Sequence, residues 1–184
     1  MRRLTVLLVA TFLVLLHASP AGAAQVIAAD PKGDGVGPGD VRAVNVEHHS
    51  DVLRLRVRTE HPIALRTSPA WHRQGSLTRL RIFLDVDPTF AGPDWFVVIK
   101  ASTGEVQTSL VPLTEQAPRD GCIPSVGQPQ PTIIQAAFGV GCVRSNGYVR
   151  AYASYRFDQG GDGTVQSVDR APNAGFGPKL VLVP

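Results

Sequence analysis

The sequence predicts an all-β protein, a single antiparallel β-sandwich of jelly-roll-like character with about eight strands and one disulfide. Beyond the N-terminal segment, no run of about 10 residues has helical periodicity, whereas apolar and polar residues alternate with period two many times. The 18 Gly and 15 Pro residues of the chain separate many of these alternating runs and mark turns between them. Short alternating strands joined by such turns are typical of two packed antiparallel sheets.

The first 24 residues have the features of a secretory signal peptide. Arg2 and Arg3 form the charged start, residues 4–16 are apolar, and residues 21–24 are small. The apolar stretch is too short for a stable membrane anchor, and no longer one follows it. We therefore expect cleavage to leave residues 25–184 as one secreted, extracellular domain without a membrane anchor.

The first strand pair is predicted around Ser50 and Asp51. Residues 41–48 and 53–58 alternate on either side of this turn, so that Val46 faces Leu55 on the buried side. The same register places Glu47 opposite Arg54 on the solvent side, where the charges attract. The register is therefore consistent on both faces.

The middle of the chain contains three further predicted strands. Residues 77–86 bury alternate apolar side chains and expose Arg79 and Arg81. Residues 95–101 and 106–113 flank a turn at 102–104, where a glycine is available for positive φ.

The last third of the chain contains three more predicted strands. Of these, residues 132–140 and 148–157 are expected to pair around Asn146-Gly147. Residues 180–183 form the terminal strand. Residues 61–76 and 115–131 are rich in Pro, which cannot donate to a sheet ladder, and are expected to be loops.

Cys122 and Cys142 are the two cysteines, and in an exported protein they are expected to form a disulfide. Closing a loop of this length stabilises a fold by about 3 kcal/mol in the chain-entropy description. A reactive thiol pair is the alternative, but the spacing is not C-x-x-C and no helix start is evident beside either residue.

Acidic turns open and close the predicted domain. Asp30, Gly33 and Asp34 are followed by Asp40-Val41, the strand at 83–87 reads Phe-Leu-Asp-Val-Asp, and Asp169 begins an Asp-Arg-Ala-Pro run. In these positions the chain resembles carbohydrate-binding-module family 9-like and DOMON-like β-sandwich modules of secreted bacterial proteins. The resemblance implies a β-sandwich and a role in binding, including sugar binding.

The acidic residues also indicate a metal site. Carboxylates on a glycine-rich segment supply the hard oxygen ligands that calcium prefers. We expect a calcium site formed by Asp30, Asp34, Asp40 and Asp169, on condition that the terminal strands are neighbours. Solvated turns without a metal are the alternative, because Asp is common in turns.

Arginine and tryptophan side chains are the candidate ligand contacts. Arg54, Arg56 and Arg58 share one strand face and, with Arg79 and Arg81 on a nearby strand, would attract an anionic cell-wall polymer or acidic glycan. An ordinary solvated face balanced by Glu47 is the alternative.

Trp71 lies in a polar loop and is expected to be exposed for sugar stacking, while Trp95 begins an apolar strand and is assigned to the core.

The composition gives little support for nucleic-acid binding. The formal charge of +3 includes Arg2 and Arg3, so the secreted part carries 16 basic against 15 acidic side chains. No nucleic-acid motif accompanies the arginines, and aromatic residues are not interleaved with them along the sequence.

The expected function is a non-catalytic binding or interaction module for a glycan or wall polymer, with a structural calcium. No nucleophile elbow, H-E-x-x-H pair or phosphate-binding loop is present. The alternative is a small secreted hydrolase that uses Asp85, His72 or loop carboxylates in an unrecognised arrangement. A structural protein that offers an edge strand to a partner is a third hypothesis, although no residue selects it.

Overall fold

The computed structural model describes residues 24–182, except 32, 36, 103, 104, 116 and 146. This part of the chain forms an antiparallel β-sandwich of eleven strands in two sheets. The expected all-β sandwich is therefore confirmed. The predicted signal segment lies outside the described residues except for Ala24, where the first strand begins.

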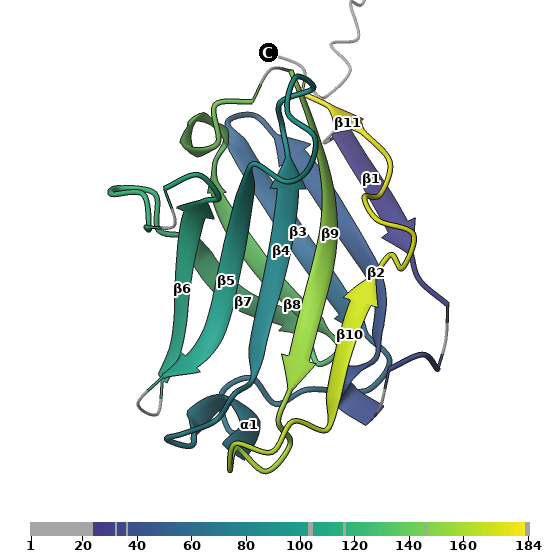
Figure 1. The fold of residues 1–184 in the computed structure, drawn as a ribbon, viewed down its shortest axis with the longest axis vertical. Coiled ribbons are helices and arrows are strands. Elements are labelled where there is room, and N and C mark those ends of the chain that lie inside the picture. Colours follow the sequence, from purple (N-terminus) through teal and green to yellow (C-terminus); the bar gives the residue numbers. More distant parts are fainter. Residues whose placement is uncertain are drawn as a thin grey trace, which may run out of the picture.

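The five-stranded sheet forms the back layer in Figure 1. Its order across the sheet is β1 (Ala24–Ala29), β2 (Val41–His49), β3 (Val52–Thr59), β8 (Ile133–Gly139) and β7 (Ser125–Gln130).

The six-stranded sheet forms the front layer (Figure 1). Its order is β10 (Ser167–Ala171), β9 (Tyr148–Phe157), β4 (Arg79–Asp85), β5 (Trp95–Ser102) and β6 (Glu105–Pro112), with β11 (Leu180–Val181) also paired to β9. The helical elements are single turns: η1 (Gly37–Gly39), α1 (Pro69–His72) and η2 (Val140–Cys142).

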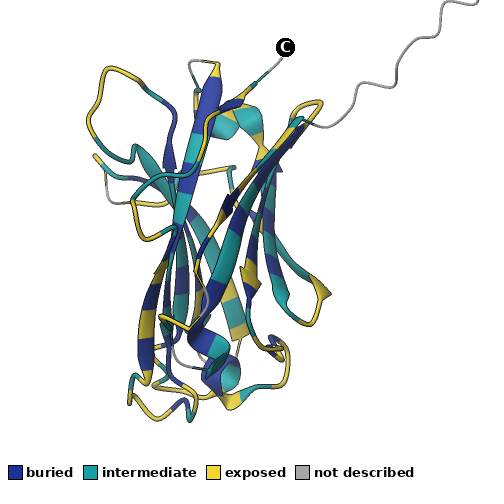
Figure 2. Cartoon of the chain, turned by 90° about the vertical axis from the view of Figure 1, so that its right-hand side faces the viewer, coloured by how far each residue is buried: buried dark blue, intermediate teal, exposed yellow. Residues whose placement is uncertain are grey.

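The hydrophobic core fills the space between the sheets. In β3, β4 and β9, buried residues alternate with less buried ones, and the bands of colour in Figure 2 show this alternation. In β4, Leu80, Ile82 and Leu84 are fully buried, as the sequence predicts, and they contribute to the same cluster as Leu55 and Val57 of β3. Period-two alternation therefore determines which face of each sheet is covered.

The local register predictions are confirmed. Val46 pairs with Leu55 and Glu47 with Arg54 across the β2–β3 hairpin. Ser50 supports this turn with a φ of 55°, in the left-handed region. The bounds of β9 also match the predicted strand 148–157.

The predicted pairing of the strands around Asn146-Gly147 is wrong. β8 pairs with β3 and β7 in one sheet, whereas β9 pairs with β4, β10 and β11 in the other. The segment between them passes from one sheet to the other through η2. A turn sequence marks a reversal of the chain, but it does not require that the flanking strands pair; Asn146 itself lies outside the described residues.

Eleven strands replace the expected eight because β1, β7 and β10 were not predicted. β7 lies inside the Pro-rich segment that was expected to be a loop, and Pro129 is tolerated there because β7 is an edge strand with an irregular register. Similarly, the predicted loop 61–76 contains α1. Ser68 precedes this helix as its N-cap, and its side chain accepts a hydrogen bond from the Ala70 N–H.

The predicted disulfide is present. Cys122 precedes β7 and Cys142 ends η2, with their Cα atoms 5.8 Å apart. The bond joins the β6–β7 connection to η2, the turn that follows β8. Among the described residues, no helix is long and apolar enough to cross a membrane.

Candidate cation site and ligand-binding surfaces

An acidic cluster forms where the β1–β2 connection meets β10 at the edge of the sandwich. The Val41 N–H, at the start of β2, donates to Asp169 Oδ2 of β10 at 2.6 Å. The Asn173 N–H, just beyond β10, donates to Asp30 Oδ1 at 2.9 Å. These two bonds hold the N-terminal turn beside the end of the chain, as the calcium prediction requires.

Three of the four predicted metal ligands meet in this cluster. Asp30, Asp34 and Asp169 each place a carboxylate oxygen so that all three atoms lie within 4.8 Å of one another. Asp30 and Asp169 are each 5% exposed, whereas Asp34 is exposed. The cluster therefore has two buried carboxylates and one that faces solvent.

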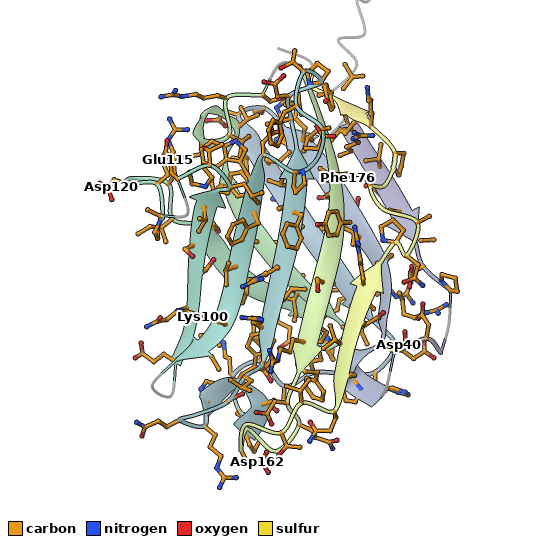
Figure 3. The ribbon with its side chains drawn as sticks, viewed as in Figure 1. Asp40, Lys100, Glu115, Asp120, Asp162 and Phe176 are labelled. Carbon is orange, nitrogen blue, oxygen red and sulfur yellow. A yellow bond between two sulfur atoms is a disulfide. The ribbon has the colours of Figure 1, made fainter. Side chains whose placement is uncertain are left out.

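Asp40, the fourth predicted ligand, lies beside this triad and outside it. Its Oδ2 accepts the Gly33 N–H at 2.9 Å, and its charge contributes to the raised pKa of Asp169. Figure 3 shows Asp40 at the edge of the sandwich next to β10. Its first role is to hold the turn that carries Asp34.

Glycine is required at one position of this turn. A Cβ on Gly35 would lie 2.6 Å from the Cα of Asp40 and 3.1 Å from Asp169 Oδ2. Because contacts below 3.0 Å with backbone are not tolerated, a larger residue would push the turn away from β10. Gly35 thereby lets the N-terminal turn approach Asp169 closely.

Among the described residues, the negative charge of the cluster is not balanced by an ion pair. No Lys or Arg of the described residues forms an ion pair with Asp30, Asp34, Asp40 or Asp169. Within the part of the chain that the structure describes, Asp30 Oδ2 and Asp40 Oδ1 are buried and have no hydrogen-bond partner. Buried carboxylate oxygens without a donor are costly, so the arrangement favours protonation or a bound cation.

The pKa values reflect the same electrostatics. Burial, together with the charges of Asp34 and Asp169, raises the pKa of Asp30 to about 6, although the Asn173 N–H opposes this shift. Burial also raises the pKa of Asp169, with smaller contributions from Asp34 and Asp40. Burial and mutual repulsion therefore favour the protonated form of both carboxyl groups.

A second acidic turn, at 158–163, belongs to a different region. Asp158 accepts the N–H groups of Leu77 and Gly163 at 3.0 and 2.8 Å, and Gly161 lies against the backbone of Pro69 in α1. In Figure 3, Asp162 lies at the α1 end of the molecule, away from Asp40. This turn fixes α1 against β4 and β9.

The expected exposure of Trp71 is wrong. Trp71 is fully buried and stacks on Tyr155 of β9, with ring centroids 6.1 Å apart. The polar residues around it in sequence belong to α1 and its flanks, which cover the α1 end of the core. In this conformation the indole is not accessible to a sugar.

The β3 arginines lie on the outer face of the five-stranded sheet, and two of them pair with Glu47. Arg56 Nη1 forms an ion pair with one Glu47 oxygen, and Arg54 Nη1 lies 3.3 Å from the other. Arg58 is exposed. Glu47 therefore balances the charges of Arg54 and Arg56, as the alternative of an ordinary solvated face predicts.

The expected shared face with Arg79 and Arg81 is wrong. These residues lie on β4, in the opposite sheet, because the connection at 60–78 crosses the sandwich. They point outward from the six-stranded sheet, since Leu80, Ile82 and Leu84 occupy its inner face.

Trp95, which the sequence assigned to the core, lines a surface pocket. This cavity of about 460 Å³ lies where β5 begins and β6 ends. Trp95 packs partly against the core, and Arg119 lies over its ring at 5.6 Å. Exposed Phe90 is a second aromatic wall, and the charged lining comes from Asp87, Asp94, Glu115, Arg119 and Arg144.

Sequence reasoning missed this pocket because its walls come from three connections. One signal was available: Asp87-Pro88 after an apolar strand marks a turn, and an exposed Phe90 follows it. Asp94 supports that turn by accepting the N–H groups of Val86 and Asp87 at 2.8 and 2.9 Å.

The residues named for a hydrolase lie in separate hydrogen-bond networks. Asp85 is fully buried, accepts the Tyr148 hydroxyl at 2.9 Å and pairs with Arg150. Burial of the Tyr148 hydroxyl, followed by its hydrogen bond to Asp85, raises the pKa of Tyr148 to about 12. His72 Nε2 lies 2.9 Å from the carbonyl oxygen of Leu65.

Comparisons with known proteins give no match: no protein-family model, curated protein or solved structure is significantly similar to this chain.

Proposed function

We propose that the protein is a secreted, non-catalytic glycan-binding module with a structural calcium ion. The pocket beside Trp95 is the observation that carries the binding function. Its volume of about 460 Å³ is in the range of small-ligand sites, and its lining combines two aromatic rings with several hydrogen-bonding groups. The disulfide and the signal-like N-terminus support secretion.

The pocket lining suits a neutral sugar. Carboxylates of Asp87, Asp94 and Glu115 accept hydrogen bonds from hydroxyl groups, and the guanidinium groups of Arg119 and Arg144 donate them. Trp95 and Phe90 provide apolar surface for the C–H face of a sugar ring. Because both signs of charge line the cavity, a neutral ligand is favoured over an ionic one.

Calcium is proposed for the acidic triad on the basis of its charge and burial. Asp30, Asp34 and Asp169 supply three oxygen ligands, and Ca²⁺ takes six to eight, so carbonyl groups or water complete the shell. Asp30 Oδ2 is buried and has no hydrogen-bond partner among the residues that the structure describes, so we assign it to the cation. Such an ion would connect the N-terminal turn to β10.

A hydrolase is the second candidate, because three carboxylates line one pocket. Against it, Asp94 accepts two backbone N–H groups, and Asp87 accepts the Thr89 N–H and hydroxyl, so both are used to hold the turn. We favour binding for this reason.

The test is a neutral oligosaccharide array probed with wild type and with Phe90→Ala. Phe90 is 48% exposed, so its removal should not impair folding. Ile123→Ala is the matched control, because Ile123 is 76% exposed and lies outside the pocket lining. We expect selective binding by wild type, weakened about tenfold by Phe90→Ala alone.

Absence of binding to any neutral oligosaccharide would refute the pocket proposal. If the recovered oligosaccharide were shortened after incubation, and Glu115→Gln stopped that cleavage, the hydrolase would replace it.

A further inference from the structure

The outer face of the six-stranded sheet carries cationic side chains in direct register. Arg79 of β4 pairs with Arg156 of β9 on one side and with Lys100 of β5 on the other. Like charges directly opposite one another in a sheet are destabilising. The fold therefore places three cations side by side at a cost to its own stability.

Two further arginines extend this charge. Arg81 follows Arg79 along the same face of β4, and its row continues through Ser154 of β9 to Arg170 of β10. None of Arg79, Arg81, Arg156, Arg170 and Lys100 forms an ion pair with a carboxylate of the described residues. Burial, followed by the charges of Arg81 and Arg156, lowers the pKa of Arg79.

Acidic residues on the strands of this face leave the charge uncompensated. Asp85 is buried and paired with Arg150, and Glu105 is the first residue of β6, opposite Ser102. The net potential of the described part of this face is therefore positive.

An aromatic row holds the arginines in place. Phe96, Phe83 and Tyr152 are cross-strand neighbours, and the stacked rings of Phe83 and Tyr152 have centroids 4.5 Å apart. The guanidinium group of Arg170 lies 4.2 Å from the centroid of Tyr152, and that of Arg81 lies 5.8 Å from the centroid of Phe96. The Phe176 ring continues the row, with its centroid 5.0 Å from that of Tyr152. In Figure 3, Lys100 lies nearer the α1 end of the molecule than Phe176 does.

The geometry points to this face as a docking surface for an acidic polysaccharide whose sugar rings carry carboxylates. The inference rests on the proposed glycan-binding role but concerns a surface separate from the Trp95 pocket. We choose a carboxylate polymer as the ligand of this surface on the basis of charge complementarity, because guanidinium groups bind carboxylates in a bidentate manner.

Neutral side chains distinguish a sugar polymer from other polyanions. Ser154 of β9 and Ser109 and Gln107 of β6 lie on the same face as the cations, where they can bond sugar hydroxyl groups. The rings of Phe83 and Tyr152 stack on each other, which reduces the ring surface free for the base stacking that single-stranded nucleic acid uses. These side chains also come from neighbouring strands of one sheet, an arrangement that suits an extended chain.

The experiment measures binding of the mature protein to polygalacturonate and to its methyl ester, which has the same sugar rings without the charge. The test variant is R79Q/R156Q, and the control is Arg58→Gln, an exposed arginine on the outer face of the other sheet. We expect wild type to bind polygalacturonate and not the ester, with affinity falling as salt increases. The double variant should lose about tenfold in affinity, and Arg58→Gln should change it less than about twofold.

The inference is overturned by equal binding to the methyl ester, by no binding to polygalacturonate at low salt, or by an unchanged affinity of R79Q/R156Q. It is also overturned if single-stranded DNA or poly(glycerol phosphate) of matched charge binds as tightly. Phe90→Ala separates the two proposals, because it should weaken binding of a neutral oligosaccharide and leave polygalacturonate binding intact. If wild type binds only one of the two ligands, the proposal for the other ligand has failed.

Discussion

The backbone N–H of Val41 donates a hydrogen bond to Asp169 Oδ2 across 128 residues of sequence, with a nitrogen–oxygen distance of 2.6 Å. This bond joins the beginning of β2 in one sheet to β10 in the other. It therefore fixes the edge of the sandwich at the point where three carboxylates meet. The stability of this edge and the occupancy of the cation site should be coupled.

Calcium should raise the thermal unfolding temperature of the protein, and Asp34→Asn should remove most of that effect. Asp34 is the exposed member of the triad, so its substitution changes the site with little effect on packing. Calcium at 100 times its Kd would stabilise the folded state by about 2.7 kcal/mol. Calorimetry with calcium or EDTA measures the effect.

Asp120→Asn is the matched control for this prediction, because Asp120 is exposed and outside the triad. It should respond to calcium like wild type. An unfolding temperature that is the same in EDTA and in excess calcium would exclude a structural calcium.

In EDTA, the contribution of Asp30 to stability should fall as the pH rises from about 4 to about 6. The ordinary pKa of Asp is 3.8, and that of Asp30 in the folded protein is about 6. Between these values the unfolded chain releases the proton and the folded protein retains it, so rising pH favours unfolding. Above about pH 6 the contribution should be constant.

Urea unfolding of wild type and Asp30→Asn in EDTA at several pH values isolates this contribution. The difference in unfolding free energy, wild type minus variant, should decrease up to about pH 6 and then level off. A difference that increases with pH would contradict the burial and charge assigned to Asp30.

Arg79→Gln should stabilise the fold, in contrast to most substitutions. It removes the like charge between Arg156 and Lys100, which are its direct neighbours on both sides. Relief of such contacts is worth about 0.2–1 kcal/mol. Chemical denaturation at low salt measures the gain, which should shrink when salt screens the charges; a loss of stability would show that Arg79 has an attractive partner.

Trp71→Ala should destabilise the protein by about 3–5 kcal/mol, the cost typical of a large aromatic removed from a core. Trp71 is fully buried against Tyr155, whereas the exposed control Ile123→Ala should change stability by less than about 0.5 kcal/mol. Trp71→Phe should fold and bind glycans like wild type. If Trp71→Phe folds but does not bind glycans, the prediction is contradicted and Trp71 belongs to the ligand-binding site.

The sequence predicted the hairpin register of β2 and β3, the bounds of β9 and the inward face of β4 because these features depend on local alternation. It did not predict β1, β7 or β10. β7 is an edge strand that contains Pro129, and propensity for such strands is weak. Pairing between sheets depends on how long connections cross the sandwich, and turn residues carry no such information.

By itself, the sequence determined the sandwich class, the disulfide partners and the residues of the acidic turns, because two cysteines have one pairing and alternation is readable along the chain. The tertiary structure decided which of these residues meet. It brought Asp30 and Asp34 to Asp169, buried Trp71, opened Trp95 to a pocket and separated Arg54 from Arg79. The physical reason is that charge clusters and cavities form between elements distant in sequence, where packing sets the neighbours.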